Sequence, residues 1–284
     1  DTETGTSSAV NTDEDGNYRV LSLNVGRYEV SAEKPGFKTL VRNGISLSVG
    51  QQAVVNLDMQ VGEVTQQVTV TEESPVINTT TSQISGLVSE QQVKDLPLNG
   101  RSFDALITLN PGAINYTAFT GGGGNSFTVA GRRAGENLYL LNGIEYTSAN
   151  NLVSTPQGAS GQLLGIDAIR EFNVLTDSYG AEYGKRAGGQ INVVTQSGSN
   201  LLRGSLFEFV RNDAFDAKPY FATGTIPPFR RNQFGGSVGG PIKQDKTFFF
   251  LSYEGERQRL GVTGAVFVPD DNARKGLLPC VSSG

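Results

Sequence analysis

Glu136-Asn-Leu-Tyr-Leu-Leu-Asn-Gly-Ile-Glu-Tyr146 is an apolar run that Asn142-Gly143 interrupts once. Asn-Gly between two apolar runs favours a tight two-residue turn, because both residues tolerate a positive φ. The sequence therefore predicts a β-hairpin whose turn is Asn142-Gly143, at the start of a longer ordered segment.

That segment continues with Gly165-Ile-Asp-Ala-Ile-Arg-Glu-Phe-Asn-Val-Leu-Thr176, then a glycine-rich turn, then Gln190-Ile-Asn-Val-Val-Thr-Gln-Ser-Gly198. Ile166 and Ile169 lie three residues apart, which predicts one short helical turn against a core. Both parts also alternate apolar and polar residues, as half-buried strands do. The alternating apolar positions are Phe172, Val174, Ile191 and Val193.

In this order, the elements resemble the plug domain of TonB-dependent outer-membrane receptors. The shared order is an apolar strand, an Asn-Gly turn, Ile-x-x-Ile-x-x-Phe-x-Val-Leu, Tyr-Gly, Gly-Gly and Gln-Ile-Asn-Val-Val-Thr. The resemblance implies a plug that fills the lumen of a large transmembrane β-barrel. The family more often has Asp-Gly at Asn142-Gly143, so the turn is kept while a charge is absent. The alternative, a generic β-rich domain with tight hairpins, does not predict this order.

Composition limits the classes of protein to which the chain can belong. With 284 residues, the chain is long enough for two domains and part of a third. Its 36 glycines exceed the usual share of about 7%, which favours β-structure with many turns. The absence of histidine and the single Cys280 exclude imidazole chemistry, His/Cys zinc sites and an internal disulfide. A net charge of −5 without a basic stripe argues against nucleic-acid binding, and we expect no cofactor or metal.

The hydropathy of the chain predicts no transmembrane helix, because no run of about 18 apolar residues occurs. The polar start, Asp1-Thr-Glu-Thr-Gly5, does not have the pattern of a signal peptide. We therefore expect the numbering to begin inside a longer product.

Residues 1–62 contain short alternating stretches separated by turn residues, which predicts a small antiparallel β-sandwich. Thr12-Asp-Glu-Asp-Gly-Asn-Tyr18, Val25-Gly-Arg-Tyr-Glu-Val30 and Lys34-Pro-Gly-Phe37 resemble carboxypeptidase-regulatory-like domains. The resemblance implies a non-catalytic, transthyretin-like fold that often precedes TonB plugs. It also implies that the first strand of this fold would lie before Asp1.

Residues 63–88 are predicted to be a linker that contains one more alternating, β-branched stretch. In the resemblance, the TonB box would lie here, a short extended segment that adds a strand to the energy-transducing partner. Main-chain hydrogen bonds supply the affinity in such strand addition. The candidate residues are Val68, Thr69, Val70 and Thr71. The alternative is that they form the last strand of the preceding sandwich.

Residues 89–200 are predicted to be the plug domain. Ser89-Glu-Gln-Gln92 fits a capping box at the start of a short helix. Leu96-Pro-Leu-Asn-Gly-Arg101 is typical of the Oar-like subgroup of TonB receptors, which carry the regulatory-like domain. A second amphipathic helix is expected from Phe103, capped by Ser102 and ended by Pro111.

Two polar loops with aromatic tips are the candidate ligand-binding segments, because such loops do not favour packing. They run from Tyr116 to Asn125 and from Tyr146 to Gln157. The candidate ligand residues are Tyr116, Phe119, Asn125, Tyr146, Asn150 and Asn151.

From residue 201 the character of the sequence changes. The chain becomes rich in aromatic residues and alternates over stretches of about 10 residues, joined on one side by the short turn Pro241-Ile-Lys-Gln-Asp245. Residues 201–284 are therefore predicted to be the incomplete beginning of a β-barrel. The overall fold class is mainly β with short helices: a transthyretin-like sandwich, an α+β plug and antiparallel barrel-type strands.

The resemblance implies the N-terminal and plug portion of a receptor in the outer membrane of a Gram-negative bacterium, where it carries out energised, non-catalytic nutrient uptake. Its partners would be a TonB-type periplasmic energy transducer and an unidentified solute. The alternative is a receptor-derived structural protein at the cell surface. It would self-associate by β-strand addition into an extracellular filament or adhesive polymer.

An enzyme is the third class of function, and the sequence argues against it. The adjacent pairs Glu72-Glu73 and Asp270-Asp271 could supply carboxylates for acid–base chemistry. Neighbouring side chains on a strand point to opposite faces, however, and no nucleophile and base are paired by the pattern. No catalytic residue is therefore predicted.

Overall fold

The computed structural model describes residues 1–63, 67–71, 83–98, 101–115, 127–146, 165–181, 183–218, 220, 226, 228–261 and 268–277. The chain divides into two compact units. The first unit consists of Asp1–Glu208 with Phe234–Glu256, and the second of Phe209–Gln233 with Arg257–Gly284. The candidate site belongs to the first unit.

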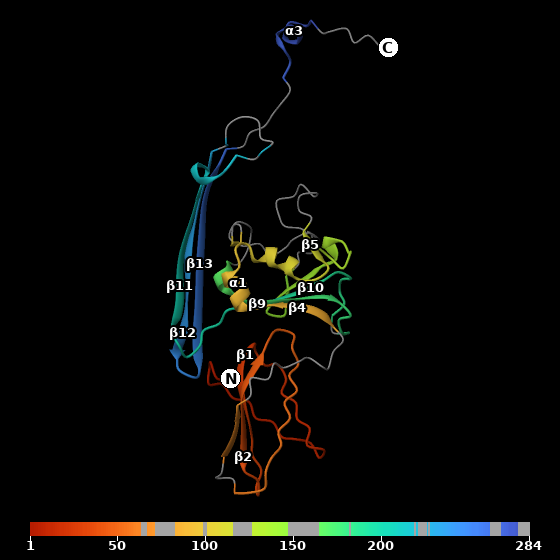
Figure 1. The fold of residues 1–284 in the computed structure, drawn as a ribbon, viewed down its shortest axis with the longest axis vertical. Helices are drawn as coiled ribbons and strands as arrows, with labels where there is room; N and C mark the ends of the chain where they lie inside the picture. Colours follow the sequence, from red (N-terminus) through yellow and green to blue (C-terminus); the bar gives the residue numbers. More distant parts are fainter. Residues whose placement is uncertain are drawn as a thin grey trace. The chain divides into compact units, whose positions relative to one another are not determined.

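The amino-terminal sheet has three strands: β1 (Gly26–Ala32), β2 (Thr39–Leu47) and β3 (Gln67–Thr71), in the order β1-β2-β3 (Figure 1). β1 and β2 are antiparallel, whereas β3 runs parallel to β2. The sequence predicted antiparallel strands only. A parallel partner needs a long connection, and residues 48–66 supply it. The sheet therefore extends past the boundary predicted at residue 62.

The plug region is built on a five-stranded sheet in the order β4-β9-β10-β7-β8 (Figure 1). β10 is parallel to β7, and the other neighbouring pairs are antiparallel. The strands are β4 (Ile84–Val88), β7 (Leu138–Leu141), β8 (Ile144–Glu145), β9 (Ile169–Asp177) and β10 (Gln190–Thr195).

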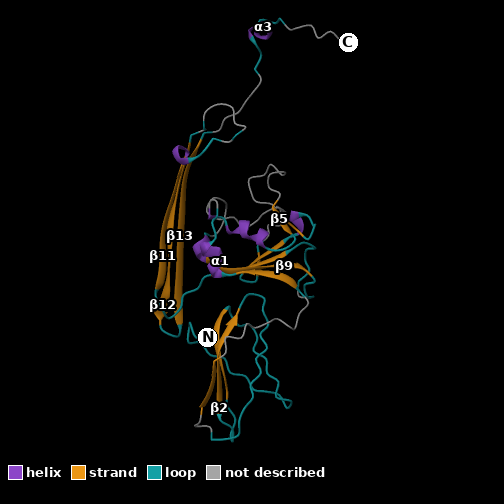
Figure 2. Ribbon diagram, viewed as in Figure 1, coloured by secondary structure: helices purple, strands orange, loops and turns teal. Residues whose placement is uncertain are grey.

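Short helices accompany this sheet (Figure 2). They are α1 (Glu90–Asp95) and the 3₁₀ helices η2 (Phe103–Leu109), η3 (Ala134–Glu136) and η4 (Ile166–Ala168). A two-stranded sheet, β5 (Ala113–Asn115) with β6 (Phe127–Val129), completes the plug region in the described residues. The helices are short because proline and glycine interrupt this part of the sequence.

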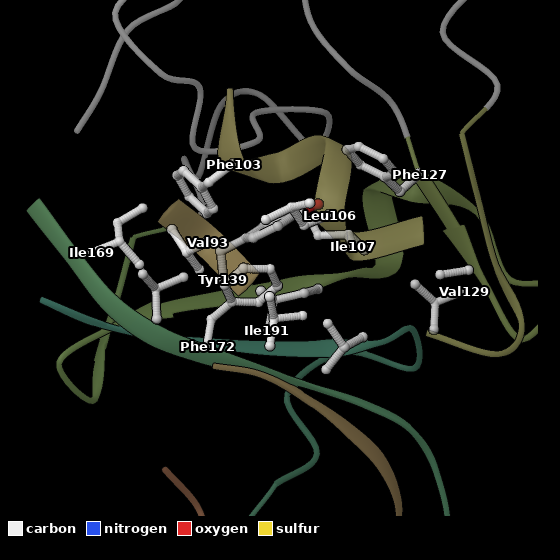
Figure 3. Close-up of a cluster of buried hydrophobic side chains, with 14 of the residues drawn as sticks. Val93, Phe103, Leu106, Ile107, Phe127, Val129, Tyr139, Ile169, Phe172 and Ile191 are labelled. Carbon is white, nitrogen blue, oxygen red and sulfur yellow. The ribbon is translucent and has the colours of Figure 1, made fainter. Parts of the chain in front are cut away.

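The core of the plug lies between these helices and one face of the sheet (Figure 3). The rings of Phe103 and Phe172 meet edge to face, with their centroids 5.7 Å apart. β9 and β10 pair Val174 with Ile191 and Phe172 with Val193, so the alternating apolar residues share one face. This confirms the two predicted strands and their pattern.

The hairpin turn at Asn142-Gly143 is confirmed. It joins β7 to β8, with φ of +49° at Asn142 and +80° at Gly143. The Asn142 side chain also accepts a hydrogen bond from the Thr195 backbone N–H at 3.0 Å, which ties the turn to β10. The helical turn predicted from Ile166 and Ile169 is confirmed as η4, and both side chains are buried.

The structure confirms one predicted cap and contradicts the other. Ser89 accepts from the Gln92 backbone N–H, and the Gln92 side chain accepts from the Ser89 N–H, which completes a capping box. The prediction that Ser102 caps the second helix was wrong. The Ser102 hydroxyl donates to the Asp104 carboxylate instead, and the segment is a 3₁₀ helix without a side-chain cap.

The prediction that β9 is half-buried was also wrong. Its alternating polar residues Glu171 and Asn173 are 7% and 6% exposed. The side chains of Glu171 and Asn173 bond to the backbone of Val49, so a segment of the amino-terminal domain covers this face. An alternating pattern shows which residues share a face, but it does not show what covers the polar one.

The third sheet has the order β11-β12-β13. Its strands are β11 (Arg203–Asn212), β12 (Phe229–Lys243) and β13 (Thr247–Leu260), longer than the sequence pattern predicted. Large apolar side chains on it are exposed, for example Leu206 at 93% and Tyr253 at 66%. The remaining described helices are η5 (Asp213–Phe215) and α3 (Asp271–Arg274).

Candidate functional site

The candidate site is an ionic cluster around Arg101, the last residue of the Leu-Pro-Leu-Asn-Gly-Arg motif. Its guanidinium forms an ion pair with Asp167 of η4, and its Nε lies 3.5 Å from an Oε of Glu254 on β13. The guanidinium carbon also lies 3.6 Å from the ring centroid of Phe207 on β11. One cation therefore contacts two carboxylates and an aromatic face.

The cluster is largely withdrawn from solvent. The side chains of Arg101, Asp167 and Glu254 are 13%, 12% and 6% exposed. Ser205 adds a hydrogen bond from its hydroxyl to Asp167 Oδ1 at 2.9 Å. A Cβ at Gly165 would overlap the Glu254 carboxylate, which would have to move from its present position.

This arrangement suits a structural connection. Arg101 holds a fixed, planar set of donors, which is suited to bridging more than one carboxylate. Removing one member of such a cluster leaves a buried charge uncompensated, which is strongly unfavourable. The cluster thereby connects plug residues to β11 and β13 of the third sheet.

Within the described ranges, no group of three or more His, Cys, Asp or Glu side chains could hold a metal ion. No helix in the part of the chain that the structure describes is long and apolar enough to cross a membrane.

The candidate TonB-box residues Val68, Thr69, Val70 and Thr71 lie together in β3. Val68 pairs with Leu40 of β2 in parallel register, and Thr71 pairs with Asn43. β3 is at the edge of its sheet, so one side of the strand has no neighbour among the described strands. The placement agrees with the alternative in which these residues are the last strand of the sandwich, and their role in partner binding stays a prediction.

Of the candidate ligand residues, the structure describes only Tyr146. It lies just after β8, is half-buried, and packs against the plug core. Burial and the nearby Asp104 carboxylate raise the pKa of its phenol. Tyr146 is therefore part of the packing around the plug core. Tyr116, Phe119, Asn125, Asn150 and Asn151 lie outside the described residues.

Sequence reasoning missed both polar contacts that connect the plug to other parts of the first unit. Arg101 was recognised as part of a motif, but no partner was predicted for it. Asp167 and Glu254 lie 66 and 153 residues away in sequence, and no local pattern pairs them. The alternating pattern of β9 predicts a half-buried strand, in which Glu171 and Asn173 would face solvent.

Three family models match the chain in succession. The Carboxypeptidase regulatory-like domain matches residues 1–60, the TonB-dependent Receptor Plug Domain residues 76–190, and the Outer membrane beta barrel domain residues 194–283. In this succession the chain is similar to TonB-dependent outer-membrane receptors. The barrel and plug matches together indicate a location in the outer membrane of a Gram-negative bacterium.

A curated relative of this chain is the TonB-dependent transporter Oar of Myxococcus xanthus. The two are 29% identical over 257 residues, which is 85% of this chain and 23% of the relative. The chain thus spans less than a quarter of the length of that transporter. The matched families are receptors and transporters, which are not enzymes.

Two solved structures are similar in part. The siderophore receptor PirA from Acinetobacter baumannii has a TM-score of 0.47 and 21% identity, covering 62% of this chain and 24% of its own. The ferripyoverdine receptor of Pseudomonas aeruginosa has a TM-score of 0.40 and 18% identity, covering 61% of this chain and 20% of its own.

Proposed function

We propose that this chain is the amino-terminal and plug portion of a receptor that takes up a nutrient through the outer membrane, using energy delivered from the periplasm. The observation that carries the proposal is the plug match followed directly by a barrel match in one chain. The Arg101 cluster supports it, because it connects plug residues to strands of the barrel match.

In this proposal the plug is the gate. Its compact core of side chains blocks passage of solute while the plug is in place. Opening requires the plug to rearrange, and the cost of breaking the Arg101 cluster opposes rearrangement without energy input. The function is gated transport without catalysis.

We propose Val68, Thr69, Val70 and Thr71 as the segment that binds a TonB-type energy transducer. Strand addition requires an exposed strand edge with free main-chain donors and acceptors, and β3 lies at the edge of its sheet. The loops from Tyr116 to Asn125 and from Tyr146 to Gln157 are the proposed contacts with solute. The domain divisions at residues 62, 88 and 200 belong to the same proposal.

The transport proposal is tested by deleting the gene and measuring growth on a panel of scarce nutrients, each supplied singly at a limiting concentration. We expect slower growth on at least one nutrient, restored by the wild-type gene and dependent on the host's TonB-type protein. Unchanged growth and uptake across the panel would contradict the transport proposal.

The partner-binding proposal is tested with Val70→Pro, which removes a main-chain donor from β3. Binding of the purified periplasmic domain of the host's TonB-type protein to the full-length receptor should weaken at least tenfold. Val70→Thr is the matched control, because it keeps both the backbone N–H and the β-branched shape. Equal binding by the wild type and Val70→Pro would show that the transducer does not bind through β3.

The structural-protein alternative receives no support from these relatives, which are named as transporters or receptors. Self-association by strand addition is a separate proposal, which is tested on the purified chain in solution.

A further inference from the structure

The polar face of the plug sheet is occupied by one turn of the amino-terminal domain. This turn, residues 48–51, is closed by a hydrogen bond from the Gln51 N–H to the Ser48 carbonyl at 3.1 Å. Val49 at its tip donates its backbone N–H to Glu171 and accepts from Asn173 Nδ2 at 3.2 Å. Both partners are on β9, a central strand of the plug sheet.

A second contact lies beside the first. Arg170, also on β9, donates to Glu3 Oε2 at 3.0 Å, and the Asn200 backbone N–H donates to the Glu3 carbonyl at 2.9 Å. The segment that carries Glu3 is itself attached to β1, because the Thr2 N–H donates to the Arg27 carbonyl at 2.9 Å. The amino-terminal domain therefore contacts the plug at two places.

We infer that Arg170, Glu171 and Asn173 form a docking surface on the plug for the amino-terminal domain, and that this docking is reversible and strengthens as the pH falls. The contacts between the two domains are hydrogen bonds and an ion pair, and two of them involve the backbone N–H and carbonyl of Val49. Interfaces between domains of one chain that are polar and small are expected to separate. Separation would expose β9, so the domain that precedes the plug would control access to the plug's central strand.

The dependence on pH follows from the burial of Glu171. Burial raises the pKa of its carboxyl from the ordinary value, with the Glu90 carboxylate acting in the same direction. The Val49 N–H and the Arg170 guanidinium oppose the shift, because both favour the charged form. A group with a higher pKa in the docked state binds more protons there, so docking is strongest below the pKa of free glutamate, about 4.3, and weakens as the pH rises through the raised value.

The chain offers a matched pair of glycines that separates docking from folding. Gly50 in the turn has φ of +71°, and a Cβ there would lie 2.7 Å from Asn173 Nδ2. Gly36 in the same domain has φ of +85°, and a Cβ there would meet nothing within 4 Å. Alanine imposes similar backbone strain at both positions, but only Gly50→Ala clashes with the plug.

The experiment is amide hydrogen exchange by mass spectrometry on the full-length receptor, with peptides that cover residues 45–52 and 169–177. We expect Gly50→Ala to increase exchange in both peptides at least fivefold relative to Gly36→Ala. Equal exchange in the two variants would overturn the docking surface, whether or not the receptor transports any solute.

The same measurement from pH 5 to pH 8, corrected for intrinsic exchange rates, tests the role of Glu171. Protection of residues 45–52 should decrease with rising pH in the wild type. In Glu171→Gln, which keeps an acceptor oxygen but does not titrate, protection should be independent of pH. A wild-type profile that is flat, or the same slope in both proteins, would overturn the pH dependence.

Discussion

At the scale of single residues, Arg101 has the most consequential contacts. Arg101→Leu would leave the carboxylates of Asp167 and Glu254 buried without their cation. Loss of one partner from a buried ion pair costs about 3–5 kcal/mol of unfolding free energy. We expect a loss of this size in chemical denaturation of the receptor. Arg133→Leu is the control, because that arginine is exposed.

Arg101→Lys refines this prediction. Lysine keeps the charge but has no planar fork, so it cannot reproduce the contacts with both carboxylates and the Phe207 ring. We expect its loss of stability to lie between those of the wild type and Arg101→Leu. If Arg101→Leu is as stable as Arg133→Leu, the cluster does not contribute to folding.

The turn at Gly143 gives a second prediction at the residue scale. A valine there would be forced to a φ near +80°, which costs of order 1–3 kcal/mol, although space around the position is open. Thermal melting of Gly143→Val should therefore occur at a lower temperature. Gly143→Asn should melt close to the wild type, because asparagine tolerates this conformation. Equal melting of the two variants would show that backbone strain is not the cause.

At the scale of elements, α1 shows what a local pattern can predict. Ser89 and Gln92 are three residues apart, and the contacts that cap the helix lie within that interval. Asp104 lies two residues after Ser102, and its carboxylate accepts a hydrogen bond from the hydroxyl that was expected to cap η2. The first cap was predictable because both of its hydrogen bonds join Ser89 and Gln92, which are close in sequence. The second was not, because the Ser102 hydroxyl bonds to a side chain and makes no bond to the backbone of η2.

Ser89→Ala tests the contribution of the cap. It removes the acceptor of the Gln92 N–H and should reduce the stability of the plug by about 1 kcal/mol. Ser89→Asp should restore most of the loss, because aspartate also caps the first turn and favours the positive end of the helix. Urea denaturation measures both variants. A stability of Ser89→Ala equal to the wild type would mean that the cap adds nothing measurable.

β9 marks the limit of prediction from sequence. Its position and its apolar face follow from alternation alone. The burial of its polar face depends on Val49, more than 120 residues earlier in the chain. For the same reason the Arg101 cluster could not be predicted, since the members of both sites come together only in the folded chain.

At the scale of the whole molecule, the order of domains was recognisable from motifs, whereas the pairing of β3 with β2 was not. Residues 68–71 have the composition of an edge strand, whether they complete the amino-terminal sheet or bind a partner. Their parallel register with β2 becomes visible only in the folded sheet. A strand that belongs to this sheet and also binds a partner must use its free edge or leave the sheet. The Val70→Pro experiment bears on both routes.

The third sheet gives the last prediction, for residues 1–284 produced alone. β11 and β13 are its outer strands, so each has one edge without a neighbour among the described strands. Unpaired strand edges are templates for pairing with another chain. The exposed Leu206, Leu251 and Tyr253 add apolar surface that favours the same association.

We therefore expect this polypeptide to self-associate in detergent-free buffer, with the segment Thr247 to Tyr253 protected between copies. Multi-angle light scattering should give a mass above the 30.2 kDa of one chain, and detergent should reduce it. A variant with Leu206→Lys and Leu251→Lys should associate less, because charges on a strand oppose pairing between copies. A contact of this kind joins different surfaces, so it extends into a fibre unless its rotation closes a ring, and electron microscopy separates these two outcomes. A stable monomer in detergent-free buffer would contradict the prediction and would mean that these edges are protected in the isolated polypeptide.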